Sequence, residues 1–93
     1  MKVYWTENAI RHLFNIYEYI AANSPTYALR MVDRITRRSE QIAEHPLSGR
    51  TVPEYEAEYI REIIEKPYRI IYRIKPEQND VLAVIHGAQI LPE

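Results

Sequence analysis

Seven arginines gathered in two clusters are the side chains with the clearest capacity for chemistry. A guanidinium can hold a phosphate or a carboxylate through paired hydrogen bonds, so each cluster predicts a contact with a nucleic acid or an acidic protein. The plainer interpretation is a solvated surface, which is the commonest setting for charged side chains. The clusters are Arg30, Arg34, Arg37 and Arg38, then Arg61, Arg69 and Arg73.

The overall charge of the chain does not favour binding to nucleic acid. Twelve Lys and Arg residues against thirteen Asp and Glu residues leave a net charge of -1 and an isoelectric point near 6.3. Non-specific binding to nucleic acid comes mainly from neutralising phosphates and usually requires excess positive charge. Any contact with RNA or DNA must therefore use a local patch.

Metal and thiol chemistry are not expected. The chain has no cysteine, which excludes disulfides, thiolate zinc sites and iron–sulfur clusters. His12 and His45 have no neighbouring residues spaced as metal ligands. We expect no cofactor. No apolar run is long enough to span a bilayer, so we expect a cytoplasmic protein.

The second arginine cluster lies on segments with the pattern of β-strands. Residues 68–75 alternate apolar side chains with Arg69, Ile71, Arg73 and Lys75, the period of a strand with one partly basic face. Residues 59–64 and 81–86 predict two further strands, and residues 2–5 a short first one. Residues 76–80 predict a hairpin turn.

Two helices separate the first strand from the others. Thr6 suits an N-cap, and apolar residues recur at spacings of three and four up to Ala21. Ser24 and Pro25 open a second helix with a capping residue and a proline at its first position. Residues 45–49, with a proline and a glycine, end that helix.

We therefore predict one α+β domain over residues 1–93 with the order β-α-α-β-β-β. An N-terminal helical hairpin packs on one face of a small, mainly antiparallel, twisted sheet of four strands. The other face is expected to be open, leaving Arg61 and Arg69 free to engage another macromolecule.

Four segments carry a family resemblance: HPLSGR at 45–50, IREI at 60–63, PYRIIYRI at 67–74 and AVIH at 83–86. Together with the order of elements, they resemble the RelE/ParE superfamily of toxins from type II toxin–antitoxin modules. The resemblance implies a growth-inhibiting toxin of the plasmid-stabilisation type, held inactive by an antitoxin. RelE-like members resemble metal-free ribonucleases that cut mRNA on the ribosome, and ParE-like members resemble inhibitors of DNA gyrase.

The ribonuclease alternative requires a base, a cation for the phosphate and an acid. Arg69 matches the position of a phosphate-stabilising arginine in RelE-like members, and Arg61 is a second candidate. His86 and Glu54 are candidates for the acid and the base. Their plainer roles are structural for His86 and a loop position for Glu54.

The ParE-like alternative is favoured. In both branches an arginine commonly lies three positions after the strand-terminal histidine, whereas Gln89 lies there in this chain. A neutral amide cannot replace a guanidinium at a charge-assisted contact. The chain also ends at Glu93, before the C-terminal tyrosine of bacterial RelE-like enzymes. A third alternative is a non-toxic protein that binds its antitoxin and regulates its operon.

In every alternative the resemblance implies a tightly bound antitoxin. We expect an antitoxin segment that is disordered when free to fold across the helical hairpin and along the sheet. A homodimer or a toxin–antitoxin hetero-oligomer is compatible with the residues. Tyr68 and Tyr72 are more consistent with core positions, although Tyr72 is also a candidate for partner contact. The partner-binding candidates are Arg30, Arg34, Arg37, Tyr72 and Arg73.

Overall fold

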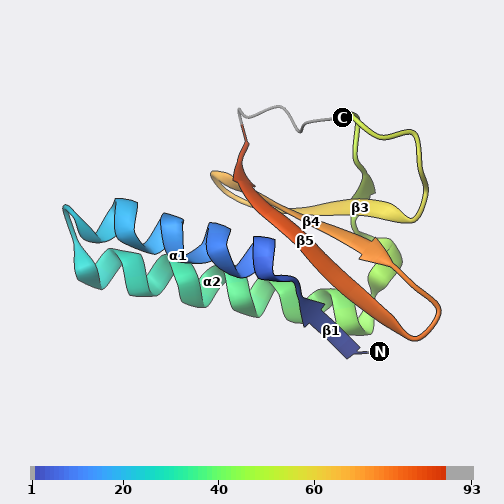
Figure 1. Ribbon diagram of the computed structural model, residues 1–93, viewed down its shortest axis with the longest axis horizontal. Coiled ribbons are helices and arrows are strands. Elements are labelled where there is room, and N and C mark those ends of the chain that lie inside the picture. The colour runs from blue at the N-terminus through green and yellow to red at the C-terminus, as the bar shows by residue number, and fades with distance from the viewer. Residues whose placement is uncertain (1, 88–93) are drawn as a thin grey trace.

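The computed structural model describes residues 2–87, and Gln89 lies outside them. Two helices and a sheet form the molecule (Figure 1). The elements are β1 (Lys2–Trp5), α1 (Glu7–Ala21), α2 (Pro25–Glu44), a 3-10 helix η1 (Pro46–Ser48), β2 (Arg50–Thr51), β3 (Ile60–Glu65), β4 (Tyr68–Ile74) and β5 (Gln78–His86).

Both helices begin where their capping residues predict. The Thr6 side chain accepts a hydrogen bond from the Ala9 amide, and the Ser24 side chain accepts one from the Tyr27 amide. Each hydroxyl satisfies a first-turn amide that has no partner within its own helix. These local signals, together with the apolar stripes, explain why the hairpin could be predicted from sequence.

The sheet has five strands in the described chain, with the order β1-β5-β4-β3-β2. β1 is parallel to β5, and the other pairs are antiparallel. The expected number of four strands was wrong because β2 is only two residues long and has no periodicity to reveal it. β5 begins at Gln78 instead of residue 81, so part of the expected turn belongs to the strand.

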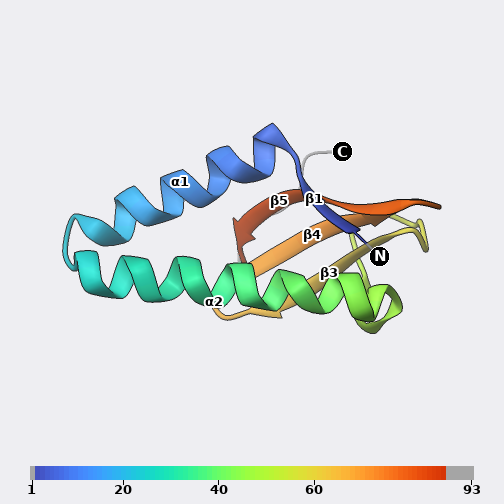
Figure 2. The ribbon, with the colours of Figure 1, turned by 90° about the horizontal axis from the view of Figure 1, so that it is seen from below.

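The helices cover one face of the sheet (Figure 2). The main core joins α1 and α2 to one side of the strands. Among its least exposed members are Met31, Ile35, Ile42, Ile70 and Tyr72. The α+β arrangement and the hairpin on one face of the sheet are confirmed.

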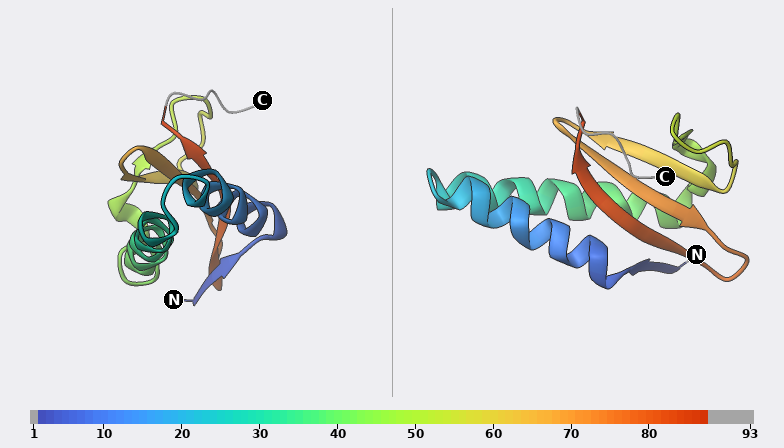
Figure 3. Two further views of the ribbon diagram at one scale, coloured as in Figure 1. Left: turned by 90° about the vertical axis from the view of Figure 1, so that its left-hand side faces the viewer. Right: turned by 45° about the horizontal axis from the view of Figure 1, so that its top comes forward.

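The expectation of an open second face was wrong. Residues 52–59 cross that face, on the side opposite the helices (Figure 3). A second apolar cluster forms beneath them around Val52, Ile71 and Ile85, with Tyr55 packed against it. Ile71 is only 1% exposed. The loop supplies the apolar cover that the helices provide on the other side.

Candidate functional site: a buried ion-pair network and a groove

Arg69 lies at the centre of a buried ion-pair network. Its Nη1 donates to Glu54 Oε2 at 2.9 Å, and its Nη2 donates to Glu54 Oε1 at 2.8 Å. Its Nε donates to Glu62 Oε1 at 2.7 Å. The Arg69 side chain is 8% exposed and the Glu62 side chain is fully buried. The expectation that Arg69 is free to engage another macromolecule was therefore wrong.

Arg50 completes this network from the edge strand. It pairs with Glu62 across β2 and β3 and binds the same carboxylate through its Nε. Two guanidinium groups thus face two carboxylates, so the formal charges cancel. The hydrogen bonds that Arg69 donates to Glu54, followed by those to Glu62, raise the pKa of Arg69 even though burial opposes its charge. The guanidinium therefore stays charged and fully engaged.

Arg61 points to the face opposite that of Arg69. Its Nη1 donates to the Gly49 carbonyl at 2.9 Å, and its Nε donates to the Glu58 carbonyl at 3.0 Å. These contacts tie β3 to the segments that flank β2. Arg61 is only partly buried, so it is the more accessible of the two candidate phosphate-binding arginines.

His86 lies toward the other end of the strands. It pairs with Tyr68, whereas Arg61 pairs with Tyr72. Tyr68 and Tyr72 are four residues apart along β4. At the rise of a strand, His86 and Arg61 are therefore separated by roughly 13 Å along the strand direction. The His86 ring contacts the Tyr68 ring edge-on, with centroids 5.9 Å apart. The four catalytic candidates are thus distributed over two faces and both ends of the sheet.

Tyr72 does not offer a surface to a partner. Its side chain is fully buried in the main core, its hydroxyl donates to the Pro46 carbonyl, and it accepts from the Gly49 amide at 3.2 Å. Burial raises the pKa of the phenol. The core positions expected for Tyr68 and Tyr72 are confirmed. The prediction that Tyr72 contacts a partner was wrong, because its side chain is fully buried.

The remaining partner-binding candidates are exposed. Arg30, Arg34 and Arg37 lie on the exposed side of α2, and Arg37 forms a salt bridge of 3.0 Å with Asp33. On β4, the Arg73 guanidinium lies 5.3 Å from the centre of the Tyr59 ring. These positions are compatible with partner contacts, which stay predictions.

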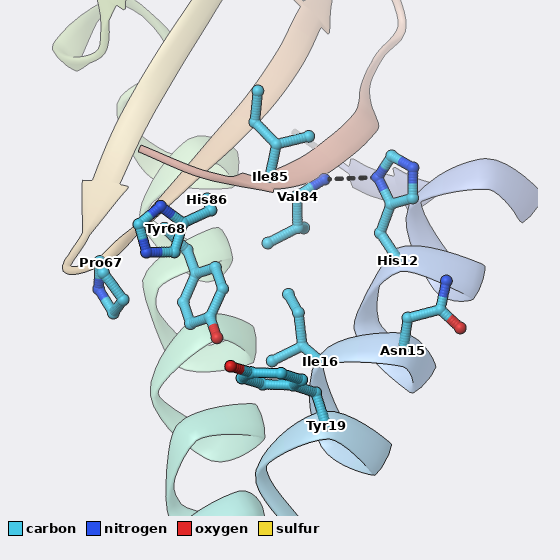
Figure 4. A pocket seen from close by; sticks show the side chains of 9 residues that line it. All are labelled: His12, Asn15, Ile16, Tyr19, Pro67, Tyr68, Val84, Ile85 and His86. Atoms are coloured by element: carbon cyan, nitrogen blue, oxygen red, sulfur yellow. Dashed lines mark hydrogen bonds between the residues drawn. The ribbon is translucent and has the colours of Figure 1, made fainter. Parts of the chain in front are cut away.

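A groove of about 750 Å³ lies between α1 and the ends of β4 and β5 (Figure 4). His12, Ile16 and Tyr19 line it from the helix, and Val84 and His86 line it from β5. The sequence pattern did not predict this groove. Its signal was weak, because His12 and His86 are 74 positions apart and only the tertiary fold brings them to one cavity.

Residues 2–87 contain neither a candidate metal site nor a candidate membrane-spanning helix. No group of three or more His, Asp or Glu side chains there could hold a metal ion. No helix within the same range is long and apolar enough to cross a membrane.

Comparisons with known proteins agree with the geometry. The family model described as "ParE toxin of type II toxin-antitoxin system, parDE" matches residues 3–91. The chain is 35% identical over 94 aligned positions to Y4kP of Sinorhizobium fredii, whose name marks it as a candidate toxin, covering 99% of this chain and 94% of that protein. It is 30% identical over 90 aligned positions to toxin RelE2 of Caulobacter vibrioides, covering 96% and 98%.

Solved structures share the fold. One, from the chromosomal ParDE toxin–antitoxin system of P. aeruginosa, is similar with a TM-score of 0.77 and 25% identity, over 92% of this chain and 95% of that one. The YoeB/ParE toxin from Agrobacterium tumefaciens has a TM-score of 0.61 at 18% identity, over 92% of this chain and 98% of that one. At this identity the similarity shows only a shared fold. The chain belongs to the ParE toxin family of type II toxin–antitoxin systems, within the RelE/ParE superfamily.

Proposed function

We propose that this toxin acts by binding DNA gyrase, without cleaving a nucleic acid itself, and that its antitoxin neutralises it. The observation that carries the proposal is the engagement of Arg69 by both Glu54 and Glu62. The match to the ParE family supports the same choice. Gyrase is a cytoplasmic target, in agreement with the location expected from the sequence.

The geometry is unfavourable for metal-free RNA cleavage by the four candidates. A base, a cation and an acid must reach the atoms around one phosphate at hydrogen-bond distance. Arg69 and Glu54 satisfy each other on the face covered by residues 52–59. His86 lines the groove on the helical side of the sheet. A substrate would have to break the buried pair and still reach a histidine on the other face.

The ribonuclease alternative is kept because of one comparison. Toxin RelE2 of Caulobacter vibrioides is 30% identical to this chain over nearly its whole length. In this alternative Arg61 and His86 would contribute from the more accessible surface, and Arg69 and Glu54 would support the fold.

Induced expression of the toxin without its antitoxin separates the possibilities. Gyrase binding predicts DNA damage and filamentous cells while bulk mRNA stays intact. Rapid loss of translated transcripts would instead support the ribonuclease. Normal growth, with the folded protein detected in the cell, would favour the regulatory alternative. Coexpression of the cognate antitoxin is the control and should restore growth in either toxic case.

A further inference from the structure

The arginines of α2 gather on one side of the helix, which we call the basic sector. At 3.6 residues per turn they fall within roughly 100° of one another around the helix axis. The acidic residues of α2 fall together on one flank of this sector, and all of these side chains are exposed. The arginines are Arg30, Arg34, Arg37 and Arg38, and the acids are Asp33, Glu40 and Glu44.

The basic sector faces away from α1. Val32 lies on the opposite side of α2, where it lines a small apolar pocket together with Leu13 and Phe14 of α1. No residue of α2 lines the groove between α1 and the ends of β4 and β5. The sector is therefore a surface separate from both the interhelical contact and that groove.

Arg61 extends the basic sector beyond the end of α2. Arg38 Nη1 donates to Gln41 Oε1 at 3.2 Å, and Gln41 Nε2 donates to Ser48 Oγ at 2.9 Å. Next to Ser48, the Leu47 carbonyl accepts a hydrogen bond of 3.4 Å from Arg61 Nη1. One surface thus joins the first arginine cluster of the sequence to Arg61, because β3 packs against α2 (Figure 2).

Most of the charge on this surface is uncompensated. Among residues 2–87, Arg37 is the only one of these five arginines that forms a salt bridge, and its partner is Asp33. Arg61 is held by neutral main-chain carbonyls. The acid on the same face of β3 is Glu65, four residues along the strand. The surface therefore has a local excess of positive charge in a chain whose net charge is -1.

The chemistry and spacing of this surface suit a phosphate backbone. A guanidinium matches a phosphate through paired hydrogen bonds. At 1.5 Å per residue, Arg30 and Arg38 are roughly 12 Å apart along the helix, the rise of about three or four phosphates on one strand of a DNA duplex. Residues 30–38 include no exposed large apolar side chain. Because protein interfaces have apolar and aromatic centres, nucleic acid is the better match.

We propose that the basic sector of α2, together with Arg61, binds the phosphate backbone of the duplex DNA held by gyrase. The toxin then recognises the gyrase–DNA complex in preference to gyrase alone. This inference rests on the proposed function, because gyrase is what brings the DNA to the toxin. Contacts with phosphates carry no sequence information, so no DNA sequence is preferred. An antitoxin that associates through the same charges would exclude the DNA.

Binding of the full-length toxin to purified gyrase, with and without linear duplex DNA, tests the proposal by fluorescence anisotropy. We expect DNA to lower the Kd of the toxin about tenfold at roughly 50 mM salt. The gain should disappear as the salt concentration rises, because phosphate contacts release counterions. Equal affinity for gyrase with and without DNA at low salt would overturn the proposal.

Paired charge removals locate the DNA contact. Arg30→Gln combined with Arg34→Gln should lose most of the gain that DNA provides, and the slope of log K against log salt should fall by about 2. Lys2→Gln combined with Arg11→Gln removes the same charge outside the basic sector and should keep the gain. Equal thermal unfolding of both variants and wild type checks the fold. A gain retained by the Arg30 and Arg34 variant would contradict the proposal.

A duplex without gyrase separates this inference from the proposed function. Wild-type toxin should bind a labelled DNA duplex of about 30 base pairs at low salt, and the Arg30 and Arg34 variant should bind it more weakly. Tighter binding of an RNA duplex, or of polyglutamate, would assign the surface to another partner and overturn the DNA assignment. If the toxin binds no form of gyrase, the proposed function fails, and the duplex measurement still decides whether the basic sector binds DNA.

Discussion

Arg69 and Glu54 face each other as a bidentate pair, with N–O distances of 2.9 and 2.8 Å. The pair joins the middle strand of the sheet to the loop that crosses its second face. Glu62 binds the same guanidinium from β3. The arginine that resembles a catalytic group in RelE-like relatives therefore fastens a loop over an apolar cluster.

Loss of this arginine should destabilise the fold. Arg69→Ala leaves Glu62 buried without its main cation, and breaking a buried pair costs roughly 3 to 5 kcal/mol. Arg73→Ala is the matched control, four residues along the same strand and exposed, and should cost less than about 1 kcal/mol. Urea unfolding monitored by circular dichroism measures both. Equal stability of the two variants would mean that the network contributes little.

The buried hydroxyl of Tyr72 should also stabilise the fold. Tyr72→Phe leaves the Gly49 amide and the Pro46 carbonyl without their shared partner. An unsatisfied buried group costs roughly 1 to 3 kcal/mol. Tyr59→Phe, at an exposed position, should change the free energy of unfolding by less than about 0.5 kcal/mol. A loss at Tyr72 no larger than that at Tyr59 would refute this assignment.

Stability should depend on the protonation of His12. Burial, and secondarily Arg11, lowers the pKa of His12 below its ordinary value of 6.5. As the pH falls below 6.5, the unfolded chain binds this proton before the folded chain does, so unfolding becomes easier. Urea unfolding at pH 7.5 and 5.5 should show a larger loss for wild type than for His12→Gln. The opposite order would show that folding raises this pKa.

The arginines of α2 should speed association with an acidic antitoxin. Charge reversal at Arg30, Arg34 and Arg37 should lower the association rate at least tenfold at low salt. The reason is that these exposed positive charges attract an acidic antitoxin and so raise the rate at which the two proteins meet. The dissociation rate should change little. Lys66→Glu, in the exposed β3–β4 turn, is the single-charge control. Stopped-flow measurements in which the triple variant associates as fast as that control would exclude a role for this cluster.

Local signals made most of the fold predictable. Thr6, Ser24 and Pro25 specify helix starts, and the alternation in residues 68–75 specifies a strand. The cover of the second face was not predictable from such signals. Residues 52–59 have no regular period, and their position depends on Val52 and Tyr55 packing against strands distant in the chain.

The candidate site was less predictable for the same reason. The family resemblance brought Arg61, Arg69 and His86 into one hypothesis, and all three do lie on neighbouring strands. Which face each side chain occupies depends on register. Glu54 was proposed as a base and is instead a partner of Arg69, because the loop folds back over β4. Glu62 has a structural role in the same network, because it pairs with both Arg50 and Arg69.

The most direct test of binding without catalysis uses the purified toxin with purified DNA gyrase and relaxed plasmid. The proposed function predicts that added toxin inhibits supercoiling or accumulates gyrase-cleaved DNA, and that added antitoxin reverses this. In parallel, ribosome-bound mRNA should stay intact by primer extension. Unaffected gyrase together with cleaved message would contradict the account.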